Sequence, residues 1–390
     1  MIVRATALKI PLPDKSVHCV ICSPPYWGLR DYGVPGQLGL EKTPEEYVQK
    51  MVQVFREVKR VLRDDGTCWI NIGDSYASGT GTCYNPGGGS SSLGKERKEA
   101  GVHPLDRGNK STLDISGLKP KDLCGIPWRL AFALQADGWW LRSDIIWAKP
   151  NPMPESVMDR PTKAHEYIFL LTKSPKYFFD QEAVREKQVD ISNCRNKPVR
   201  ANPGIGNTSS GGRREGFEKY GRYAEVPGGR NIRTVWNIAT QPFSEAHFAT
   251  FPEELVRRCL FAGTSEKGCC PKCGGPWMRI IEKRLMAHDG ESASQYAKGT
   301  TANRLALLRQ AARERGEEYS NQTKTLGWRP SCECGEERTV PAIVFDPFFG
   351  SGTVGVVAQK YNRRFIGLEL KPEYCQMAQK RVNSQSMPMI

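Results

Sequence analysis

The chain contains 390 residues, of which 39% are hydrophobic, and its formal net charge is +14. This apolar content is sufficient for a buried core in one large domain or in a few smaller units. The sequence has no run of about 18 apolar residues, so it predicts no membrane-spanning helix. It also begins without the apolar segment of a secretory signal, which favours a cytoplasmic location.

Two features of the composition concern partners and redox state. The excess of positive charge favours a polyanionic partner such as nucleic acid, because contacts between basic side chains and phosphates release counterions. The thirteen cysteines of a cytoplasmic chain favour reduced thiols or a metal site over a framework of disulfides. A small, disulfide-stabilised secreted protein is therefore disfavoured.

The first half of the chain alternates apolar runs with amphipathic stretches. A six-residue apolar run predicts a buried strand, and the stretch after it predicts a helix with Thr43 as N-cap. This alternation predicts an α/β fold, a Rossmann-like, doubly wound and mostly parallel sheet. Strands are predicted at residues 17–22, 67–72, 139–147 and 166–172, and helices at residues 43–63 and 123–137.

Ser23, Pro24, Pro25 and Tyr26 follow the first predicted strand directly. The Ser23 hydroxyl and the Pro24 carbonyl can both accept hydrogen bonds, and successive prolines restrict the backbone that carries them. Two such acceptors can bind the N–H groups of an exocyclic amine and free its lone pair, while Tyr26 stacks on the base. The turn therefore predicts a catalytic site for an amine. The neighbouring Cys22 is expected to be a buried, unreactive thiol.

The C-terminal part of the chain predicts a strand, a glycine-rich turn and a helix, at residues 343–345, 346–352 and 353–360. Glycines in such a turn let the backbone approach a ligand closely, and the helix N-terminus can bind a carboxylate. The next predicted strand, 364–369, ends in an acid that can accept hydrogen bonds from ribose hydroxyls. The candidate cofactor-binding residues are Asp346, Phe348, Gly350, Gly352, Thr353 and Glu369.

Two cysteine pairs suggest a metal site. Cys270 and Cys273 form a C-x-x-C-G knuckle, and Cys332 and Cys334 form a C-x-C pair. Four thiolates at tetrahedral positions make a closed structural zinc site, which predicts a role in stability or DNA contact and not in catalysis. Cys269 is an alternative ligand to Cys270.

Two polar stretches interrupt this pattern. Residues 182–233 are rich in Gly, Asn, Ser and Arg, with interspersed Phe and Tyr side chains. This composition is typical of a nucleic-acid-binding loop that becomes ordered on binding, and also of a disordered linker. Residues 78–94 are rich in Gly and Ser and follow a predicted strand. They form either a mobile loop at the ligand-binding edge of the sheet or a surface insertion.

The two motifs and their order resemble the β class of DNA amino-methyltransferases, which methylate cytosine N4 or adenine N6 using S-adenosylmethionine. In that family the catalytic motif precedes the cofactor motif, as it does in this chain. The Ser-Pro-Pro-Tyr turn resembles the catalytic motif, the glycine turn resembles the methionine-binding turn, and the acid after it resembles the ribose-binding acid. The residues that carry the resemblance are Ser23, Pro24, Pro25, Tyr26, Asp346, Phe348, Gly350, Gly352 and Glu369.

The resemblance divides the chain by function. It implies a catalytic half, a target-recognition region, a cofactor-binding half in two pieces and a cysteine-knuckle insertion, at residues 1–180, 181–240, 241–267 with 338–390, and 268–337. The sequence departs from the family in one place. The family often carries Gly-Asp-Ala before the catalytic strand, with its Asp binding the cofactor adenine, whereas this chain has Ala5-Thr6-Ala7-Leu8.

The resemblance also implies an activity and partners. The expected activity is site-specific methylation of a base flipped out of double-stranded DNA, and serine in the catalytic motif favours cytosine N4. Adenine N6 methylation, a non-catalytic DNA-binding protein that keeps the fold, and an RNA substrate are the alternatives. S-adenosylmethionine and a structural zinc ion are the expected cofactors. A prokaryotic or infected host cell, association with the nucleoid and a companion restriction endonuclease fit the family.

Overall fold

The computed structural model of the protein describes residues 1–29, 31–77, 83–84, 117–189, 225–241, 251–286 and 320–384. The chain divides into two compact units. The larger unit contains Met1–Ala183, Arg233–Met278 and Arg329–Ile390, and the smaller contains Val184–Ile232 and Arg279–Trp328. Among the described residues, no helix combines the length and the apolar character that crossing a membrane requires.

An eight-stranded sheet forms the centre of the larger unit, in the order β1-β14-β13-β2-β3-β7-β6-β10. Strand β7 is antiparallel to both of its neighbours, and every other adjacent pair is parallel. The predicted mixed, mostly parallel α/β fold is thereby confirmed. The strands are β1 (Ile2–Arg4), β2 (Val17–Cys22), β3 (Leu62–Ile72), β6 (Trp140–Ala148), β7 (His165–Thr172), β10 (Val235–Asn237), β13 (Ile343–Asp346) and β14 (Arg364–Glu369).

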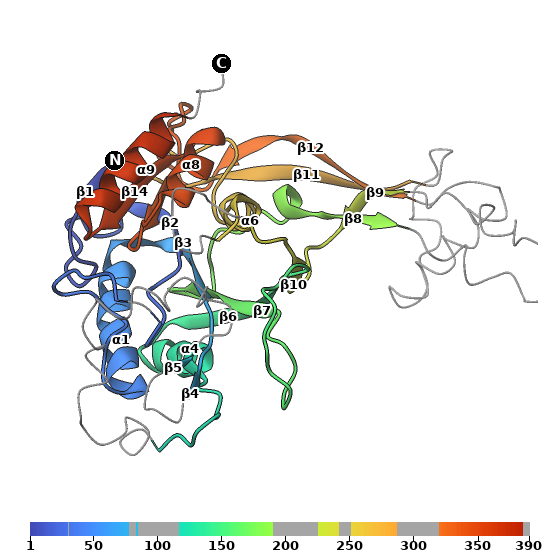
Figure 1. The fold of residues 1–390 in the computed structure, drawn as a ribbon. Helices are drawn as coiled ribbons and strands as arrows, with labels where there is room; N and C mark the ends of the chain where they lie inside the picture. The colour runs from blue at the N-terminus through green and yellow to red at the C-terminus, as the bar shows by residue number, and fades with distance from the viewer. Residues whose placement is uncertain are drawn as a thin grey trace, which may run out of the picture. The chain divides into compact units, whose positions relative to one another are not determined.

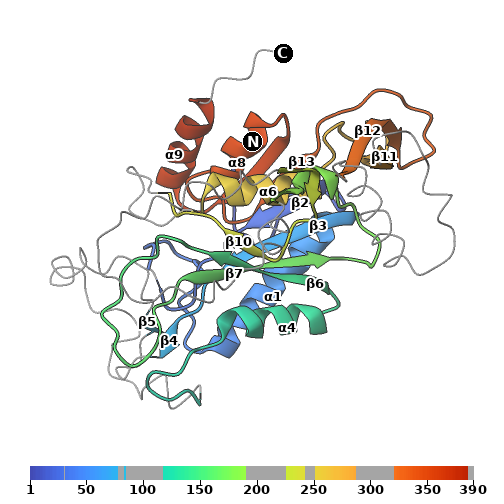
Figure 2. The same ribbon diagram turned by 90° about the vertical axis from the view of Figure 1, so that its right-hand side faces the viewer.

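Helices cover both faces of this sheet, as Figures 1 and 2 show. On one face α1 (Pro44–Val61) packs against α4 (Ile126–Ala136). On the other face α6 (Glu253–Gly263), α8 (Thr353–Lys360) and α9 (Pro372–Asn383) lie together. The connections β2–α1–β3 and β13–α8–β14 therefore run on opposite faces and away from each other. Strands β2 and β13 are neighbours where the strand order reverses, which is where such sheets bind ligands.

Helix α1 illustrates how local sequence determines an element. The Thr43 hydroxyl accepts a hydrogen bond from the Glu46 amide at 3.1 Å, and Pro44 occupies the first turn. Acids in the first turn and bases in the last complement the helix dipole. The predicted N-cap is confirmed. The buried face of the helix consists of Pro44, Tyr47, Met51, Val54, Phe55, Val58 and Val61.

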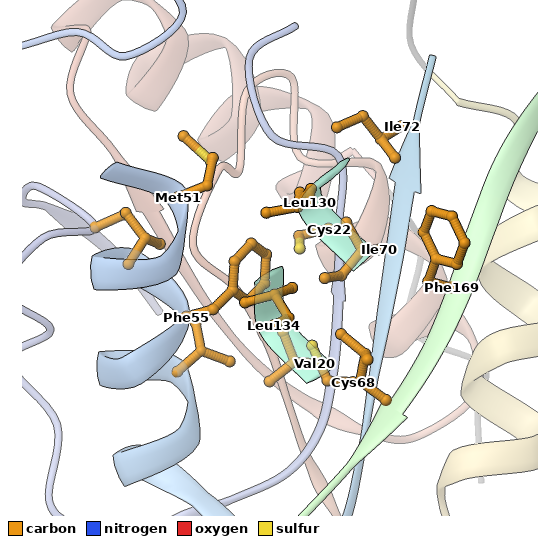
Figure 3. Close-up of a cluster of buried hydrophobic side chains, with 14 of the residues drawn as sticks. Val20, Cys22, Met51, Phe55, Cys68, Ile70, Ile72, Leu130, Leu134 and Phe169 are labelled. Carbon is orange, nitrogen blue, oxygen red and sulfur yellow. The ribbon is translucent and has the colours of Figure 1, made fainter. Parts of the chain in front are cut away.

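Figure 3 shows the apolar cluster that fixes β2 between this helix and the rest of the sheet. Met51 and Phe55 of α1 face the β2 side chains Val20 and Cys22, and all four are at most 1% exposed. Burying an apolar side chain of this size contributes roughly 1.5–3 kcal/mol. Packing therefore holds β2 up to the residue that precedes Ser23. Cys22 is buried as predicted, and burial is the main cause that raises the pKa of its thiol well above the usual value.

The remaining elements are short or belong to the smaller unit. In the larger unit β4 (Tyr76–Ala77) pairs with β5 (Cys83–Tyr84). The smaller unit contains two two-stranded sheets, one of β8 (Glu186–Val189) with β9 (Glu225–Arg230) and one of β11 (Trp277–Met286) with β12 (Ser320–Pro330). A single 3-10 turn, η2 (Glu182–Val184), precedes β8. Most of the Gly/Ser-rich stretch 78–94, and residues 190–224 of the expected recognition region, lie outside the described residues.

Candidate active site

The prolyl turn and the glycine turn begin side by side. Val344 of β13 is in register with Cys19 of β2, so the two parallel strands end at the same edge of the sheet. The segments that follow the two turns also meet, since the Lys371 ammonium donates a hydrogen bond to the Tyr32 carbonyl at 3.4 Å. The Tyr32 and Tyr374 rings pack edge to face with centroids 6.4 Å apart. The structure therefore brings together candidate residues from the two ends of the sequence.

The prolyl turn is anchored by neighbouring side chains but leaves one acceptor without a partner. The Tyr47 hydroxyl of α1 donates to the Pro25 carbonyl at 2.8 Å, and the Trp27 indole donates to the Glu41 carbonyl at 2.9 Å. No described residue donates a hydrogen bond to the carbonyl oxygen of Pro24, a residue that is buried as a whole. Buried carbonyl groups in native proteins are nearly always paired. The Pro24 oxygen is thus available to a ligand with an N–H group.

Tyr26 is held from two directions. Its ring lies against the backbone of Gly73, where an added Cβ would come within 2.7 Å of the Tyr26 Cε2 atom. Its hydroxyl donates to Glu166 Oε2 at 2.7 Å, and the Ser23 hydroxyl lies 3.5 Å from it as a donor. The sequence analysis predicted neither Gly73 nor Glu166. A sequence signal exists for Glu166, which is an acid at the start of an otherwise apolar strand.

Glu166 is the centre of a largely buried polar network. Its side chain is 15% exposed and accepts hydrogen bonds from Asn71 Nδ2 at 3.1 Å and from the Lys149 ammonium. Burial by itself raises the pKa of Glu166, but the charge and hydrogen bond of Lys149, with the bonds from Tyr26 and Asn71, outweigh burial and lower it below its usual value. Glu166 is therefore ionised at neutral pH, next to the candidate catalytic turn.

The glycine turn contains a carboxyl group with little solvent contact. Asp346 is 1% exposed, and its Oδ1 atom accepts a hydrogen bond from the Phe348 amide at 2.9 Å. Burial raises the pKa of Asp346 to about 8. Gly350 and Gly352 have φ angles of 49° and 82°, in the left-handed region that favours glycine, so the turn depends on both residues. Gly352 then caps α8, which begins at Thr353.

Glu369 ties this turn to the start of α9. Its Oε2 atom accepts from the Gly350 amide at 2.8 Å, and its Oε1 atom accepts from the Leu370 and Lys371 amides, both at 2.9 Å. Burial raises the pKa of Glu369 above its usual value. A carboxylate has about four acceptor positions, so Glu369 retains capacity for donors from a ligand.

The aromatic side chain of Phe349 packs beneath the backbone of the glycine turn, on the side of the protein interior. Phe349 is 2% exposed and stacks on Phe365 with ring centroids 5.6 Å apart. A Cβ atom at Gly355 would lie 2.6 Å from the Phe349 ring, and one at Gly367 would overlap it. Glycine at these two positions makes room for the ring, a requirement that sequence reasoning missed. Thr353, the remaining candidate, accepts a hydrogen bond from the Arg381 guanidinium at 2.9 Å.

The four predicted metal ligands lie together. The sulfur atoms of Cys270, Cys273, Cys332 and Cys334 are all within 4.8 Å of one another. This spacing fits a tetrahedral ion with metal–sulfur bonds of about 2.3 Å. Backbone amides, that of Cys273 first, lower the pKa of the Cys270 thiol to about 7, which favours a thiolate. Cys269 is not part of the cluster, because its backbone pairs with Val340 in both directions. The cluster thus contains the predicted set and excludes the alternative.

The knuckle contacts the opposite edge of the sheet from the two turns. The His18 Nδ1 atom accepts from the Ile343 amide at 3.0 Å, and Nε2 lies 3.0 Å from the Gly274 carbonyl. Burial and the neighbouring Arg63 lower the pKa of His18 to about 4, so the ring is neutral and Nε2 is its donor. Arg63 donates to the Cys273 carbonyl at 2.7 Å. These contacts are made at the first residues of β2, β3 and β13, at the opposite ends of these strands from the prolyl and glycine turns.

Comparisons with known proteins agree with this geometry. A model of the family described as DNA methylase, which covers N6 and N4 enzymes, matches residues 17–270 and 340–380. The Type II methyltransferase M.Cfr9I of Citrobacter freundii is 39% identical over 379 residues, covering 97% of this chain and 85% of that protein. M.SmaI of Serratia marcescens is 37% identical over 371 residues, covering 95% and 86%.

Solved structures share the fold. The PvuII DNA methyltransferase, described as cytosine-N4-specific, aligns with a TM-score of 0.50 at 15% sequence identity, covering 99% of this chain and 88% of that one. At this identity the likeness concerns the fold alone. Taken with the family match and the long alignments to Type II methyltransferases, it leads to one assignment. The chain belongs to the DNA amino-methyltransferases of the β class, the N6/N4 DNA methylase family.

Proposed function

We propose that this protein transfers a methyl group from S-adenosylmethionine to the exocyclic amine of a base flipped out of double-stranded DNA, and that the base is cytosine, methylated at N4. The observation that carries the proposal is the Pro24 carbonyl, which has no donor among the described residues, beside the Ser23 hydroxyl at the edge where the glycine turn also begins. The site then needs a ligand with two N–H groups and a second ligand on the glycine turn.

Ser23 and Pro24 act on the amine. Its lone pair is delocalised into the base, so the nitrogen is a weak nucleophile until its N–H groups are held out of the ring plane. The Ser23 oxygen accepts one N–H and the Pro24 oxygen accepts the other, and the buried, anchored turn keeps both oxygens in place. Tyr26 bounds the site and offers its ring to the flipped base.

Asp346, Glu369 and the glycines hold the methyl donor. The bound S-adenosylmethionine supplies an electrophilic methyl group on a sulfonium. The turn at Gly350 and Gly352 and the N-terminus of α8 suit its amino-acid end, and the Asp346 carboxyl group, beside this turn, would accept a hydrogen bond from its ammonium. Glu369 has acceptor capacity for ribose hydroxyls. Phe348 is partly buried and packs against the apolar core cluster that contains Val20, Cys22 and Phe55.

Cytosine N4 is preferred to adenine N6 because the first residue of the catalytic motif is serine. Adenine N6 stays the alternative, since both bases present an amine with two N–H groups and both fit the same pair of acceptors. The PvuII neighbour, whose description names cytosine N4, agrees in fold but does not by itself decide the base.

The decisive experiment identifies the methylated base. Purified protein is incubated with labelled S-adenosylmethionine and double-stranded DNA, and the DNA is digested to nucleosides and separated. Label in N4-methyl-2′-deoxycytidine supports the proposal, and label in N6-methyl-2′-deoxyadenosine replaces the cytosine assignment with the alternative. Label in RNA but not in DNA, or no transfer by a protein that binds the cofactor, would contradict it.

The proposal has three further parts. We propose a structural zinc ion on Cys270, Cys273, Cys332 and Cys334, because their sulfurs fit a closed tetrahedral site. We propose that residues 181–240 read the DNA target, because their sequence combines basic and aromatic side chains. A companion restriction endonuclease is proposed from the Type II names of the relatives.

A further inference from the structure

We propose that Glu166 is a positioning residue for methyl transfer, because it orients the hydroxyl groups of Tyr26 and Ser23 so that the Ser23 oxygen faces the target amine as an acceptor. The inference deepens the proposed function and depends on it. It adds Glu166, Lys149 and Asn71 to the residues on which the catalytic turn relies.

The hydrogen bonds form a chain with one direction. The Ser23 hydroxyl donates to the Tyr26 oxygen, 3.5 Å away. The Tyr26 hydroxyl donates to Glu166 Oε2, its nearer acceptor at 2.7 Å, while Asn71 Oδ1 lies farther away at 3.4 Å. A hydroxyl group has one proton and two lone pairs. When the Ser23 proton points to Tyr26, both lone pairs of its oxygen remain for the N–H group of the amine. The carboxylate at the end of the chain sets this direction, because it can only accept.

Lys149 and Asn71 keep the carboxylate in that state. Lys149 forms an ion pair with Glu166 Oε1, and Asn71 Nδ2 donates to Oε2 at 3.1 Å. A protonated Glu166 could donate to Tyr26, which would then donate to Ser23. That reversal would turn the Ser23 proton towards the amine, where it would repel the N–H group. Lys149 therefore keeps the Ser23 oxygen oriented as a hydrogen-bond acceptor, although it does not contact Ser23.

The topology explains why the network reaches the site. Glu166 is the second residue of β7, the antiparallel strand, so its chain begins at the edge where the parallel strands end. Lys149 follows β6 directly, and Ala148 is in register with His165. Asn71 is the next-to-last residue of β3 and is 3% exposed. Three strands thus deliver one polar group each to the same place beside Tyr26.

A purely structural role predicts something different. In that case Glu166 and Lys149 only satisfy each other, and loss of either lowers stability without a specific effect on the chemical step. The two roles are separated by the coupling between Glu166 and Tyr26. If Glu166 acts through the Tyr26 hydroxyl, replacing Glu166 in a variant that lacks this hydroxyl should have almost no further effect on the rate of methyl transfer.

The experiment measures single-turnover methyl transfer to DNA at saturating cofactor for Glu166→Ala, Glu166→Gln, Tyr26→Phe and the double variant Glu166→Ala with Tyr26→Phe. We expect Glu166→Ala to slow transfer about 100-fold, in the range of lost preorganised polar groups. Glu166→Gln, which keeps an acceptor oxygen, recovers at least part of the rate. The double variant is no slower than Tyr26→Phe alone, and the dissociation constants for cofactor and DNA stay within about threefold.

Asp65→Asn is the matched control. Asp65 is also an acid paired with a basic residue, Arg63, but it lies at the opposite edge of the sheet. We expect this variant to lose stability without losing rate. If Glu166→Ala does not fold, Glu166→Gln combined with Tyr26→Phe gives the same coupling. If the rate losses of the two single variants multiply in the double variant, or if folded Glu166 variants transfer at the normal rate, the positioning role is overturned. The proposed function would still stand. Absence of transfer by the wild-type protein would overturn the proposed function together with it.

Discussion

The two edges of the central sheet differ in how their polar groups are satisfied. One edge is formed by the first residues of β2, β3 and β13. There the His18 ring forms hydrogen bonds with the Gly274 carbonyl of the cysteine knuckle and with the Ile343 amide of β13. The Arg63 guanidinium donates to the Cys273 carbonyl of the knuckle. At the edge where β2 and β13 end, the Pro24 oxygen has no donor among the described residues and Asp346 is buried as an acid. At the first edge these side chains are paired within the protein, and the four thiols of the knuckle are the groups for which we propose a zinc ion. At the second edge we propose that a ligand pairs with the Pro24 oxygen.

The largest effect on methyl transfer is expected from changing the prolyl turn at the edge where β2 and β13 end. Replacing Ser23 and Pro24 together by alanine removes the hydroxyl acceptor and the restriction that the first proline imposes on the turn. We expect methyl transfer to fall about 1000-fold, since one preorganised polar contact alone accounts for about 100- to 1000-fold. Labelled transfer measures the loss, with S-adenosylmethionine binding by calorimetry as control. A double variant that retains more than a tenth of the activity would contradict the assigned roles.

The next prediction breaks the opposite edge. Cys273→Ser should remove a metal ligand, release the zinc that we expect at about one ion per chain, and lower the melting temperature. Metal analysis and thermal denaturation check these outcomes. Because the described contacts of the knuckle with β2 and β3 are made at the first residues of these strands, the folded variant should keep its rate of methyl transfer at low temperature. A fully stable, metal-free wild-type protein would show that the cluster is a set of free thiols.

A smaller effect is expected where the glycine turn rests on Phe349. Gly367→Ala should destabilise the protein by about 1–3 kcal/mol, as overpacking of a buried site does, because the new methyl group would overlap the Phe349 ring. Chemical denaturation measures the change. Gly327→Ala is the control, since no atom lies within 4 Å of a Cβ at that position. Equal stability of the two variants would show that the turn can rearrange around the ring.

The last prediction concerns how the stability of the folded protein depends on pH. The pKa of Asp346 is raised to about 8 in the folded protein, above its ordinary value of 3.8. The native state therefore binds a proton that the unfolded chain releases between these values, so this residue favours folding most at low pH. Its contribution declines as pH rises from about 4 to about 8. Asp346→Asn should remove this decline, and melting curves of the cofactor-free proteins at several pH values across that window will show whether it does.

Local sequence was sufficient for several elements and for the placement of the two turns. The predicted bounds of β2, α8 and β14 agree with the structure because short apolar runs and glycine breaks define them. The two turns meet because β2 and β13 are neighbouring parallel strands that end at the same edge of the sheet. The catalytic and cofactor roles of the residues stay predictions until the variants above are measured.

The polar network behind Tyr26 could not be predicted in the same way. Glu166 is 140 residues from Tyr26 in sequence, and their contact depends on an antiparallel strand whose direction no local pattern specifies. Gly73 and Gly367 look like ordinary glycines until the rings that they accommodate are placed. Each miss concerns long-range geometry and not residue chemistry.

The pairing of β13 with β2 has a consequence for biosynthesis. Val344 and Cys19 are partners at the centre of the sheet, yet more than 300 residues separate them along the chain. At the usual 5–20 residues per second, a ribosome needs roughly 15 to 65 s to travel between them. During that interval β2 lacks its neighbour and its edge is exposed to wrong pairing. A nascent chain of this protein can therefore complete its central sheet only after translation has passed β13.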